Sequence, residues 1–221
     1  MAIVIAIDGP AGAGKSTIAR RLASRLGYTY IDTGAMYRAV ALWAIRQDVD
    51  LSDMHRLDQL AQAAEIRFEE SGQRVFLNDE DVTDIIRNPQ VSAASSQVAA
   101  VPSVRRALVA KQRAMGETGN VVMEGRDIGT VVFPDAKLKI FLDADAGERV
   151  RRRVEEFNGD SERIASQLAE RDRRDRSRRE APLTQAPDAI YLDSTRLSPE
   201  AVEEEILRLL RARIGNGKEH H

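Results

Sequence analysis

A glycine-rich segment near the start of the chain ends in a lysine and a serine: Gly9-Pro10-Ala11-Gly12-Ala13-Gly14-Lys15-Ser16. It fits the pattern G-x-x-x-x-G-K-[ST], it follows an apolar run at 3–7, and a helical pattern follows it at 16–26. In that context the glycines let backbone N–H groups converge on phosphates, and the helix adds its positive end. We predict that Lys15 reaches the β- and γ-phosphates of a nucleotide and that the Ser16 hydroxyl binds Mg²⁺. The alternative is a glycine-rich turn without function.

A second set of polar residues, Asp32-Thr33-Gly34 with Tyr37 and Arg38, follows the next strand-like run. Ligands of parallel sheets bind beyond the carboxyl ends of the strands, so this set is expected beside the glycine-rich segment. Arg38 offers a planar fork suited to a phosphate, and Tyr37 can line a nucleotide pocket. Asp32 is placed to orient Mg²⁺ through water. The alternative is an ordinary helix start with a surface arginine.

The segment from Glu124 to Thr130 contains two glycines around an Arg-Asp pair, directly after an apolar run. This composition at a strand end predicts a tight loop that contacts a ligand. Arg126 can bind the phosphate of an acceptor, and Asp127 can accept a hydrogen bond from the exocyclic amine of a base. The alternative is a structural turn with a local ion pair.

The arginine-rich stretch at 171–178 places Arg171, Asp175 and Arg178 on one face of a helix, at i, i+4 and i+7. Such a row can hold a sugar hydroxyl and a phosphate together. A solvated, salt-bridged face is an open alternative, and an RNA-binding helix is a weaker one because the acids cancel the positive field. Ser96 and Arg105 are polar candidates near a helix break at Val101-Pro102, although nothing in the local sequence marks them as functional.

Short apolar runs alternate with helical patterns along most of the chain. The runs are 3–8, 28–31, 121–124, 138–142 and 189–192, and the helical patterns are 16–26, 35–46, 104–115, 147–156, 163–179 and 199–214. This alternation predicts an α/β fold, a parallel sheet with helices on both faces. Residues 64–100 break the rhythm: 65–68 and 74–77 alternate in hydrophobicity around Ser71-Gly72, which predicts a β-hairpin in a small inserted subdomain.

Composition narrows the class of protein further. The chain has 221 residues, 43% of them hydrophobic, and a net charge of −2 although 31% are charged. One domain with an insertion is expected, without a basic field for nucleic acid or membrane surfaces. There are no cysteines, no run as long as a membrane span and no basic segment before the first strand, so we expect a cytoplasmic protein without a signal peptide. The stretch 216–221, which ends in two histidines, is interpreted as a disordered tail or tag remnant.

Taken together, these motifs resemble the bacterial cytidylate kinases, over about residues 3–211. The matching pieces are residues 8–16, 32–38, 95–99, 125–134, 139–143, 171–178 and 181–183. The glycine-rich motif is shared by many proteins, whereas Gly-Arg-Asp-Ile-Gly-Thr-Val-Val-Phe-Pro at 125–134 is far more specific. The resemblance implies a P-loop NTPase fold with a five-stranded parallel sheet: a core at 1–63 and 101–215, an inserted monophosphate-binding subdomain at 64–100 and a mobile lid at about 149–163.

The resemblance also implies ATP- and Mg²⁺-dependent phosphorylation of CMP and dCMP to CDP and dCDP by a monomer. The implied ATP-binding residues are Gly9, Pro10, Ala11, Gly12, Ala13, Gly14, Lys15, Ser16 and Thr17. The implied CMP-binding residues are Thr33, Tyr37, Arg38, Ser96, Arg105, Arg126, Asp127, Arg171, Asp175 and Arg178. Lys15, Arg38 and Arg126 are the expected catalytic residues. The segment 157–162 is shorter than the family's lid, so no lid arginine is assigned to ATP.

Three rival functions remain open from the sequence. A kinase for another small acceptor, such as a different monophosphate or shikimate, would use the same glycine-rich segment. A nucleotide-dependent switch is a second rival, although the chain lacks the N-K-x-D tetrapeptide typical of guanine-reading switches. An RNA-binding protein that uses the arginine-rich helix is the third.

Overall fold

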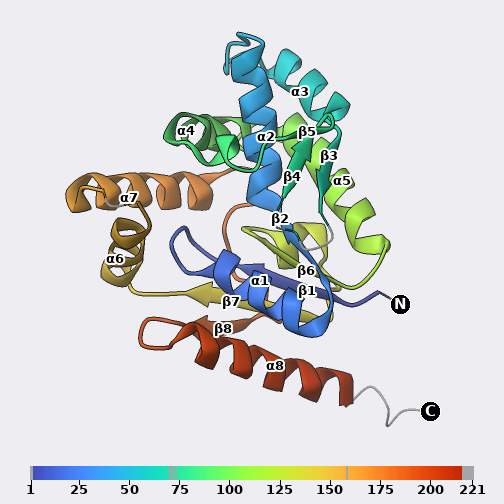
Figure 1. Ribbon diagram of the computed structural model, residues 1–221, viewed down its shortest axis with the longest axis vertical. Helices are drawn as coiled ribbons and strands as arrows, with labels where there is room; N and C mark the ends of the chain where they lie inside the picture. The colour runs from blue at the N-terminus through green and yellow to red at the C-terminus, as the bar shows by residue number, and fades with distance from the viewer. Residues whose placement is uncertain (1, 70–71, 73, 158, 216–221) are drawn as a thin grey trace.

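The computed structural model describes residues 2–69, 72, 74–157 and 159–215, so the predicted tail at 216–221 lies outside the described residues (Figure 1). A five-stranded sheet has the order β2-β6-β1-β7-β8, and every neighbouring pair in it is parallel. Its strands are β1 (Val4–Asp8), β2 (Thr29–Asp32), β6 (Val121–Gly125), β7 (Leu138–Asp143) and β8 (Ile190–Asp193). These are the five predicted strands, and the predicted parallel sheet is confirmed.

Helices cover both faces of this sheet because both faces are apolar. In β1, Ile5 and Ile7 pack on one side with α1 (Lys15–Leu26) and α8 (Pro199–Gly215). Val4 and Ala6 pack on the other side, where the turn η2 (Ile128–Val132) lies. All five residues of β1 are buried, as expected for a central strand of a parallel sheet.

A smaller antiparallel sheet lies above the large sheet in Figure 1 and approaches its edge strand β2, where Gly72 lies against Tyr30. It contains β3 (Ile66–Phe68), β4 (Val75–Leu77) and β5 (Glu80–Asp81), so the predicted hairpin is present. Around it lie α2 (Thr33–Arg46), α3 (Met54–Ala63), the single turn η1 (Ile85–Arg87), α4 (Pro89–Val98) and α5 (Pro102–Glu117). One hydrophobic core joins these elements, so the packing of this region extends beyond 64–100 into α2, α3 and α5.

The sequence patterns missed α3 and α4. Both helices are short, and each begins at a side-chain cap: Asp53 accepts from the Arg56 N–H, and Asn88 accepts from the Val91 N–H. The predicted break at Val101-Pro102 is confirmed, since Val101 separates α4 from α5 and Pro102 starts α5.

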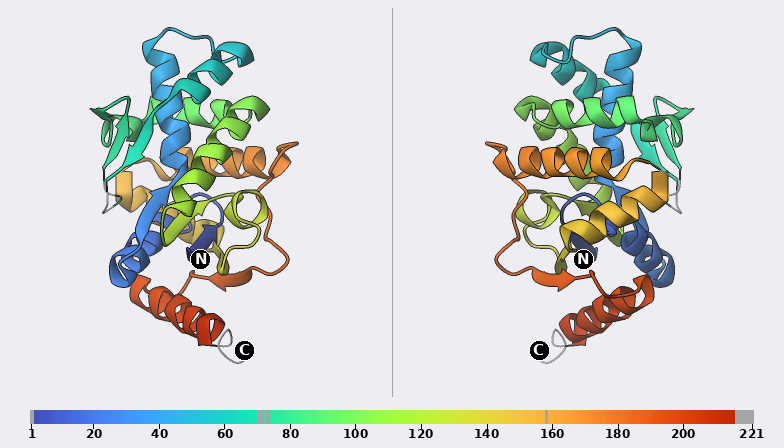
Figure 2. Two further views of the ribbon diagram at one scale, coloured as in Figure 1. Left: turned by 90° about the vertical axis from the view of Figure 1, so that its right-hand side faces the viewer. Right: turned by 90° about the vertical axis from the view of Figure 1, so that its left-hand side faces the viewer.

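Two further helices follow β7: α6 (Ala146–Phe157) and α7 (Ser161–Ser177). Figures 1 and 2 show them lying between the large sheet and the α2–α5 region, with α7 packed on α6. The predicted lid at 149–163 covers most of α6 and the start of α7. The helix predicted to reach residue 179 ends at Ser177, because Arg178 leaves helical geometry with ψ 135°.

Candidate active site

We call residues 9–17 the P-loop: a loop at 9–14 that follows β1, together with the first residues of α1 at 15–17. Gly9 has φ 150°, and a Cβ there would lie 1.9 Å from the Leu142 carbonyl oxygen, so only glycine fits. Gly12 and Gly14 are left-handed, with φ 79° and 89°. The Lys15 ammonium is buried and donates to the Pro10 carbonyl at 2.6 Å. The segment therefore has the predicted strand–loop–helix geometry, and the Lys15 side chain is hydrogen-bonded to a backbone carbonyl of the same loop.

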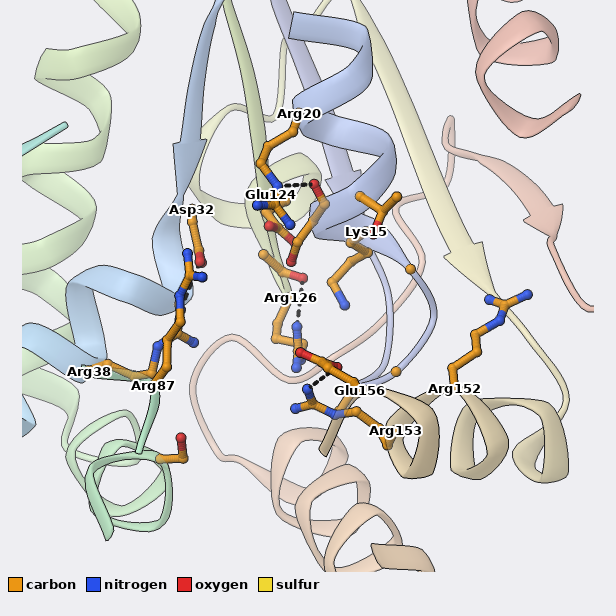
Figure 3. Close-up of a pocket in the computed structure, with 18 of the residues that line it drawn as sticks. Lys15, Arg20, Asp32, Arg38, Arg87, Glu124, Arg126, Arg152, Arg153 and Glu156 are labelled. Carbon is orange, nitrogen blue, oxygen red and sulfur yellow. Dashed lines mark hydrogen bonds and ion pairs between the residues drawn. The ribbon is translucent and has the colours of Figure 1, made fainter. Parts of the chain in front are cut away.

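A pocket of about 450 Å³ opens beside the P-loop (Figure 3). The predicted residues that line it are Ala11, Gly12, Gly14, Lys15, Ser16, Thr17, Asp32, Arg38, Arg126 and Arg171. Figure 3 shows Arg126 in the centre, with Asp32, Arg38 and Arg87 on one side of it and the α6 arginines on the other. Segments far apart in the chain thus meet at one cavity, next to the carboxyl ends of β1, β2 and β6, where a ligand of an open α/β sheet is expected.

The pocket holds a concentration of positive charge. Burial and the nearby Arg126 and Arg171 lower the pKa of Lys15 to about 7. Burial and the neighbouring cations Arg126, Arg38 and Arg153 lower the pKa of Arg171 to about 9, although Asp175 partly offsets the effect. The Arg38 Nε is buried without a hydrogen-bond acceptor in the described part of the chain. Depressed pKa values of this kind indicate a site in which an anion would be bound favourably.

Two carboxylates end neighbouring strands at this pocket, since Asp32 of β2 and Glu124 of β6 are register partners. Asp32 accepts from the Ala35 N–H at 2.9 Å and from Arg38 at 2.7 Å. Burial opposes its ionisation, but Arg38 and the Ala35 N–H more than offset this, so the pKa of Asp32 lies below its usual value. Burial, and then the charge of Asp32, raise the pKa of Glu124, which accepts hydrogen bonds from Tyr30 and Ser16.

The predicted row on α7 is largely buried and joins the pocket. Arg126 donates to Asp175 at 2.8 Å, and Arg178 lies 3.7 Å from the same carboxylate. The Arg178 Nη2 is buried without a hydrogen-bond acceptor among the described residues. Elsewhere on α7, Arg173 and Arg174 form exposed ion pairs with Glu170. Both predictions for this stretch therefore apply to parts of the helix: Arg171, Asp175 and Arg178 form the largely buried row, and Glu170, Arg173 and Arg174 form ion pairs in solvent.

A third predicted group lies behind Arg126 and does not line the pocket. Arg105 of α5 forms a buried ion pair with Asp127, and its guanidinium stacks 5.4 Å from the centre of the Tyr37 ring. Burial raises the pKa of Tyr37 to about 12, so its hydroxyl is protonated near neutral pH. Asp127 and Arg178 are close enough for their charges to interact, which connects this group with the α7 row.

The remaining predicted residues are placed as follows. The Thr33 hydroxyl is buried and donates to the Glu124 carbonyl at 2.7 Å, which ties α2 to the end of β6. Ser96 is half-buried on α4, one turn after Ser92, so both serines share a face of that helix. Ser92 lines the pocket and Ser96 does not.

Eight polar pocket residues were missed by the sequence reasoning: Arg20, Tyr30, Arg87, Ser92, Glu124, Arg152, Arg153 and Glu156. Glu124 was visible at the end of an apolar run and next to the Arg-Asp pair, so its position could have marked it. Arg87 and Ser92 come from the α2–α5 region, and nothing in their local sequence indicates a pocket. The three α6 residues belong to a charge-dense stretch in which buried and solvated positions look alike.

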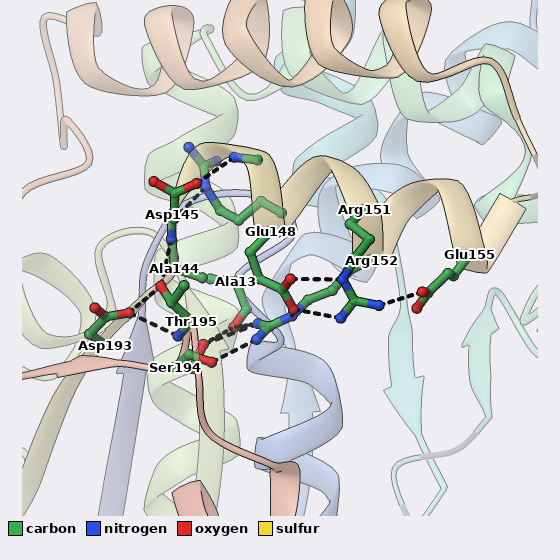
Figure 4. Close-up of polar contacts among 12 residues, drawn as sticks. Ala13, Ala144, Asp145, Glu148, Arg151, Arg152, Glu155, Asp193, Ser194 and Thr195 are labelled. Carbon is green, nitrogen blue, oxygen red and sulfur yellow. Dashed lines mark hydrogen bonds and ion pairs between the residues drawn. The ribbon is translucent and has the colours of Figure 1, made fainter.

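Helix α6 contacts the P-loop through its arginines. Arg149 donates to the Ala11 carbonyl at 3.0 Å and to Asp172 at 2.6 Å. Arg152 donates to the Ser194 carbonyl at 2.7 Å and to the Ala13 carbonyl at 3.3 Å (Figure 4). These contacts hold two carbonyls of the P-loop against α6 and so restrict the conformation of the loop.

A second cavity, of about 370 Å³, adjoins the first and shares Gly14, Thr17 and Arg152 with it. Its wall includes the apolar side chains of Ile18, Leu197, Pro199 and Val202, from α1, the segment after β8 and α8. The two cavities thus lie next to each other, and the second has the more apolar lining.

The P-loop, the order of the parallel strands and the adjoining arginine-lined pocket define the class of protein as a P-loop kinase. Among solved structures, a gluconokinase from Sinorhizobium meliloti matches 99% of this chain and 98% of its own with a TM-score of 0.53 and 13% identity. A sugar kinase from Janibacter matches 95% of each chain with a TM-score of 0.50 and 16% identity. These similarities support the fold alone.

Sequence comparison gives the family. The model of the family described as cytidylate kinase matches residues 5–212. A cytidylate kinase of Solibacter usitatus is 60% identical over 98% of this chain and 96% of its own length. Those of Geobacillus kaustophilus and Pseudomonas aeruginosa are 52% and 50% identical, over 96% and 93% of this chain. The chain therefore belongs to the cytidylate kinase family, and the predicted resemblance is confirmed.

Proposed function

We propose that this protein transfers the γ-phosphoryl group of ATP to CMP or dCMP, giving ADP and the nucleoside diphosphate. The observation that carries the proposal is the single cavity in which a P-loop faces guanidinium groups from α2, α7 and the segment after β6. The P-loop would hold the phosphates of the donor, and the guanidinium groups would hold the phosphate of the acceptor. Membership of the cytidylate kinase family supports the choice of acceptor.

The donor would lie along the P-loop and continue into the second cavity. The N–H groups of residues 9–17 would bind its phosphates, with Lys15 released from the Pro10 carbonyl to reach the β- and γ-phosphates. The more apolar second cavity, lined by Leu197, Pro199 and Val202, suits the base of the nucleotide. Arg152 lines both cavities and lies where the donor phosphates and ribose would meet.

The residues at the P-loop also fit Mg²⁺. Among the described residues, no group of three or more His, Cys, Asp or Glu side chains is placed to hold a metal ion, but Mg²⁺ in kinases needs only one or two protein ligands besides phosphates and water. Ser16 would bind it directly, as predicted. Glu124, which accepts a hydrogen bond from Ser16 and has a pKa raised by burial, is suited to a nearby cation, and Asp32 would act through water. The bound ion would neutralise charge on the β- and γ-phosphates.

The acceptor would lie between α2, α4 and α7. Arg38 and Arg126 would hold its phosphate, because both line the pocket and Arg38 has a free buried N–H. Arg171, Asp175 and Arg178 would contact the phosphate and ribose. Asp127 and Arg105, with Ser96, would recognise cytosine, since a carboxylate accepts from the amino group that distinguishes cytosine from uracil. Tyr37 and Thr33 would support this wall.

These parts suffice because phosphoryl transfer needs positioning and positive charge more than covalent chemistry. Two phosphate groups repel each other, so the acceptor phosphate must be neutralised before it can attack in line. Arg38 and Arg126 would supply that neutralisation, and Lys15 would stabilise charge on the moving group. Helices α6 and α7 would exclude water, which otherwise competes as an acceptor.

A panel of acceptors tests the proposal. With ATP and Mg²⁺, release of ADP is measured with CMP, dCMP, UMP, AMP and shikimate, and without an acceptor. Fast turnover with CMP or dCMP and negligible hydrolysis alone is expected. Faster turnover with another acceptor would reassign the substrate, and hydrolysis without acceptor would favour a switch. RNA binding with steep salt dependence and no transfer would favour the RNA-binding alternative.

Location and assembly follow as secondary expectations. In the described part of the chain, no helix is both long enough and apolar enough to cross a bilayer. We expect the enzyme to act in the cytoplasm, where its nucleotide substrates are found, and as a monomer. Light scattering during size-exclusion chromatography measures the latter directly.

A further inference from the structure

Asp8 is a buried carboxylate at the last position of β1, only 5% exposed. Its two oxygens accept separate backbone hydrogen bonds, from the Ile128 N–H at 2.8 Å and from the Gly129 N–H at 2.7 Å. These donors begin the turn η2, which is 120 residues further along the chain. A single side chain therefore joins two segments that meet only in the folded protein.

Each of those segments continues directly into one half of the active site. Asp8 precedes Gly9, the first residue of the P-loop. Ile128 and Gly129 follow Arg126 and Asp127, which are proposed to hold the acceptor. The strands also pair here, with Asp8 opposite Gly125. The β1–β6 pairing ends at Asp8 and Gly125. Beyond it, the Asp8 carboxylate ties the segment at 126–129 to the start of the P-loop.

We infer that Asp8 is a positioning residue, which sets the distance and angle between the donor phosphates on the P-loop and the acceptor phosphate on Arg126. The inference rests on the proposed roles of the P-loop and Arg126. In-line transfer is sensitive to small errors of alignment, so a shifted acceptor segment slows the chemical step more than it weakens binding of either nucleotide alone.

Only the ionised carboxylate accepts both hydrogen bonds well. When one oxygen is protonated, its O–H points towards a backbone N–H, and two donors then face each other. Burial raises the pKa of Asp8 to about 6. The hydrogen bonds from the Gly129 and Ile128 N–H groups lower this pKa, the charge of Asp127 raises it, and the charge of Lys15 lowers it. The other charged group near this contact is Lys139 of β7, which packs on Gly129 and pairs with Asp188 at 2.7 Å.

The test is Asp8→Asn in the full chain. Asparagine keeps the shape but replaces one acceptor oxygen with an NH₂ group that opposes a backbone N–H. We expect kcat with CMP to fall at least about tenfold, while the separately measured affinities for ADP and for CMP stay within about twofold. Asp53→Asn is the matched control, since Asp53 also accepts a backbone N–H but lies at the exposed start of α3; its kcat should not change.

A pH profile separates positioning from general damage. The acceptor phosphate titrates near pH 6 as well, so the readout is the ratio of wild-type kcat to variant kcat. This ratio should fall as the pH is lowered from about 8 to 5, because wild-type Asp8 becomes protonated while asparagine does not titrate. A ratio that is independent of pH would overturn the inference, as would a folded variant with wild-type kcat.

Gly129→Ala is a second variant for the case in which Asp8→Asn does not fold. Its Cβ would lie 3.4 Å from Asp8 Oδ2, an ordinary contact, but 3.0 Å from Cδ of Lys139, which is buried and held by Asp188; Gly129 and its N–H should therefore shift relative to the carboxylate without loss of the charge. Lower kcat with retained binding supports the inference. Unchanged kcat overturns it, and so does loss of ADP or CMP binding that matches the loss of kcat. Failure of the wild type to phosphorylate CMP would instead refute the proposed function.

Discussion

The proposed donor side and the proposed acceptor side of this pocket are formed by different groups. The P-loop presents backbone N–H groups, shaped by glycines and by carbonyl contacts from Arg149 and Arg152. The acceptor side presents side chains, and in this structure their charges already have partners: Arg126 with Asp175, and Arg105 with Asp127. The backbone of the proposed donor site is therefore already held by internal contacts, although Lys15 must leave the Pro10 carbonyl, whereas an acceptor must enter a network of existing ion pairs.

This contrast implies different sensitivities. Truncating a side chain does not remove a backbone N–H group, so the proposed donor site is best disrupted by a change of shape. The acceptor site is best disrupted one guanidinium at a time, and each loss leaves a carboxylate without its partner. Side-chain recognition also allows selectivity among acceptors, which a cradle of N–H groups cannot provide.

The largest effect is expected from a change of shape on the donor side. Gly9→Ala would place a Cβ 1.9 Å from the Leu142 carbonyl oxygen and must displace the P-loop, so activity should fall by more than about a hundredfold. Gly27→Ala is the control: Gly27 also has positive φ, 67°, but has open space around it. It should lose only about 1 kcal/mol of stability, measured by urea unfolding, and keep its activity. Equal activity of the two variants would contradict the prediction.

On the acceptor side, Arg126→Ala should reduce kcat/KM for CMP by tens- to several hundred-fold, or about 2–4 kcal/mol, through loss of a charge-assisted contact with the phosphate. The control is Arg106→Ala, an exposed arginine of α5 that is 4.0 Å from its carboxylate partner. Steady-state kinetics and a thermal melt separate the loss of activity from unfolding. Wild-type kinetics for the Arg126 variant would remove this residue from the mechanism.

A smaller effect, on selectivity, is expected at Asp127. Asp127→Asn keeps the size of the side chain next to Arg105, but an amide can donate as well as accept. The preference for CMP over UMP should fall by about tenfold, while turnover with CMP changes less. The kcat/KM values for CMP, UMP and AMP measure this directly. An unchanged order of preference would show that the base is recognised elsewhere.

The smallest effect concerns Asp8, which joins the two sides. Its pKa is raised in the folded protein, to about 6, so its contribution to stability is present at low pH and is lost as the pH rises through about 6. Relative to Asp8→Asn, the wild type should gain about 1–1.5 kcal/mol of unfolding free energy between pH 7.5 and 5. Urea unfolding at both pH values tests the sign. A gain on raising the pH would show that the ionised carboxylate is the stabilised form.

The sheet could be predicted because each of its strands is a short apolar run bounded by polar residues. The helices α3 and α4 could not, since a helix of ten residues with a small apolar face, such as Leu57, Leu60 and Ala61 in α3, is stabilised mainly by tertiary packing. The end of α7 was misplaced by two residues. The sequence around Arg178 is compatible with a helix, but the backbone leaves helical geometry at that residue.

The site shows the same division. The residues of the P-loop are consecutive in the chain, so its geometry could be predicted from the sequence alone. Arg87 and Ser92 enter the pocket from the α2–α5 region, and only the fold brings them to Arg38 and Asp32. Within α6, Arg151 pairs in solvent while its neighbour Arg152 contacts the P-loop, a difference that depends on which way the helix faces.

The contacts from Arg149 and Arg152 to the carbonyls of Ala11 and Ala13 make the opening of α6 inseparable from the stiffness of the loop beneath it. If α6 swings outward to let ADP leave, those oxygens lose their donors and the loop relaxes at the same moment. The order of the P-loop would then depend on the position of α6, and it would be restored only when the helix returns.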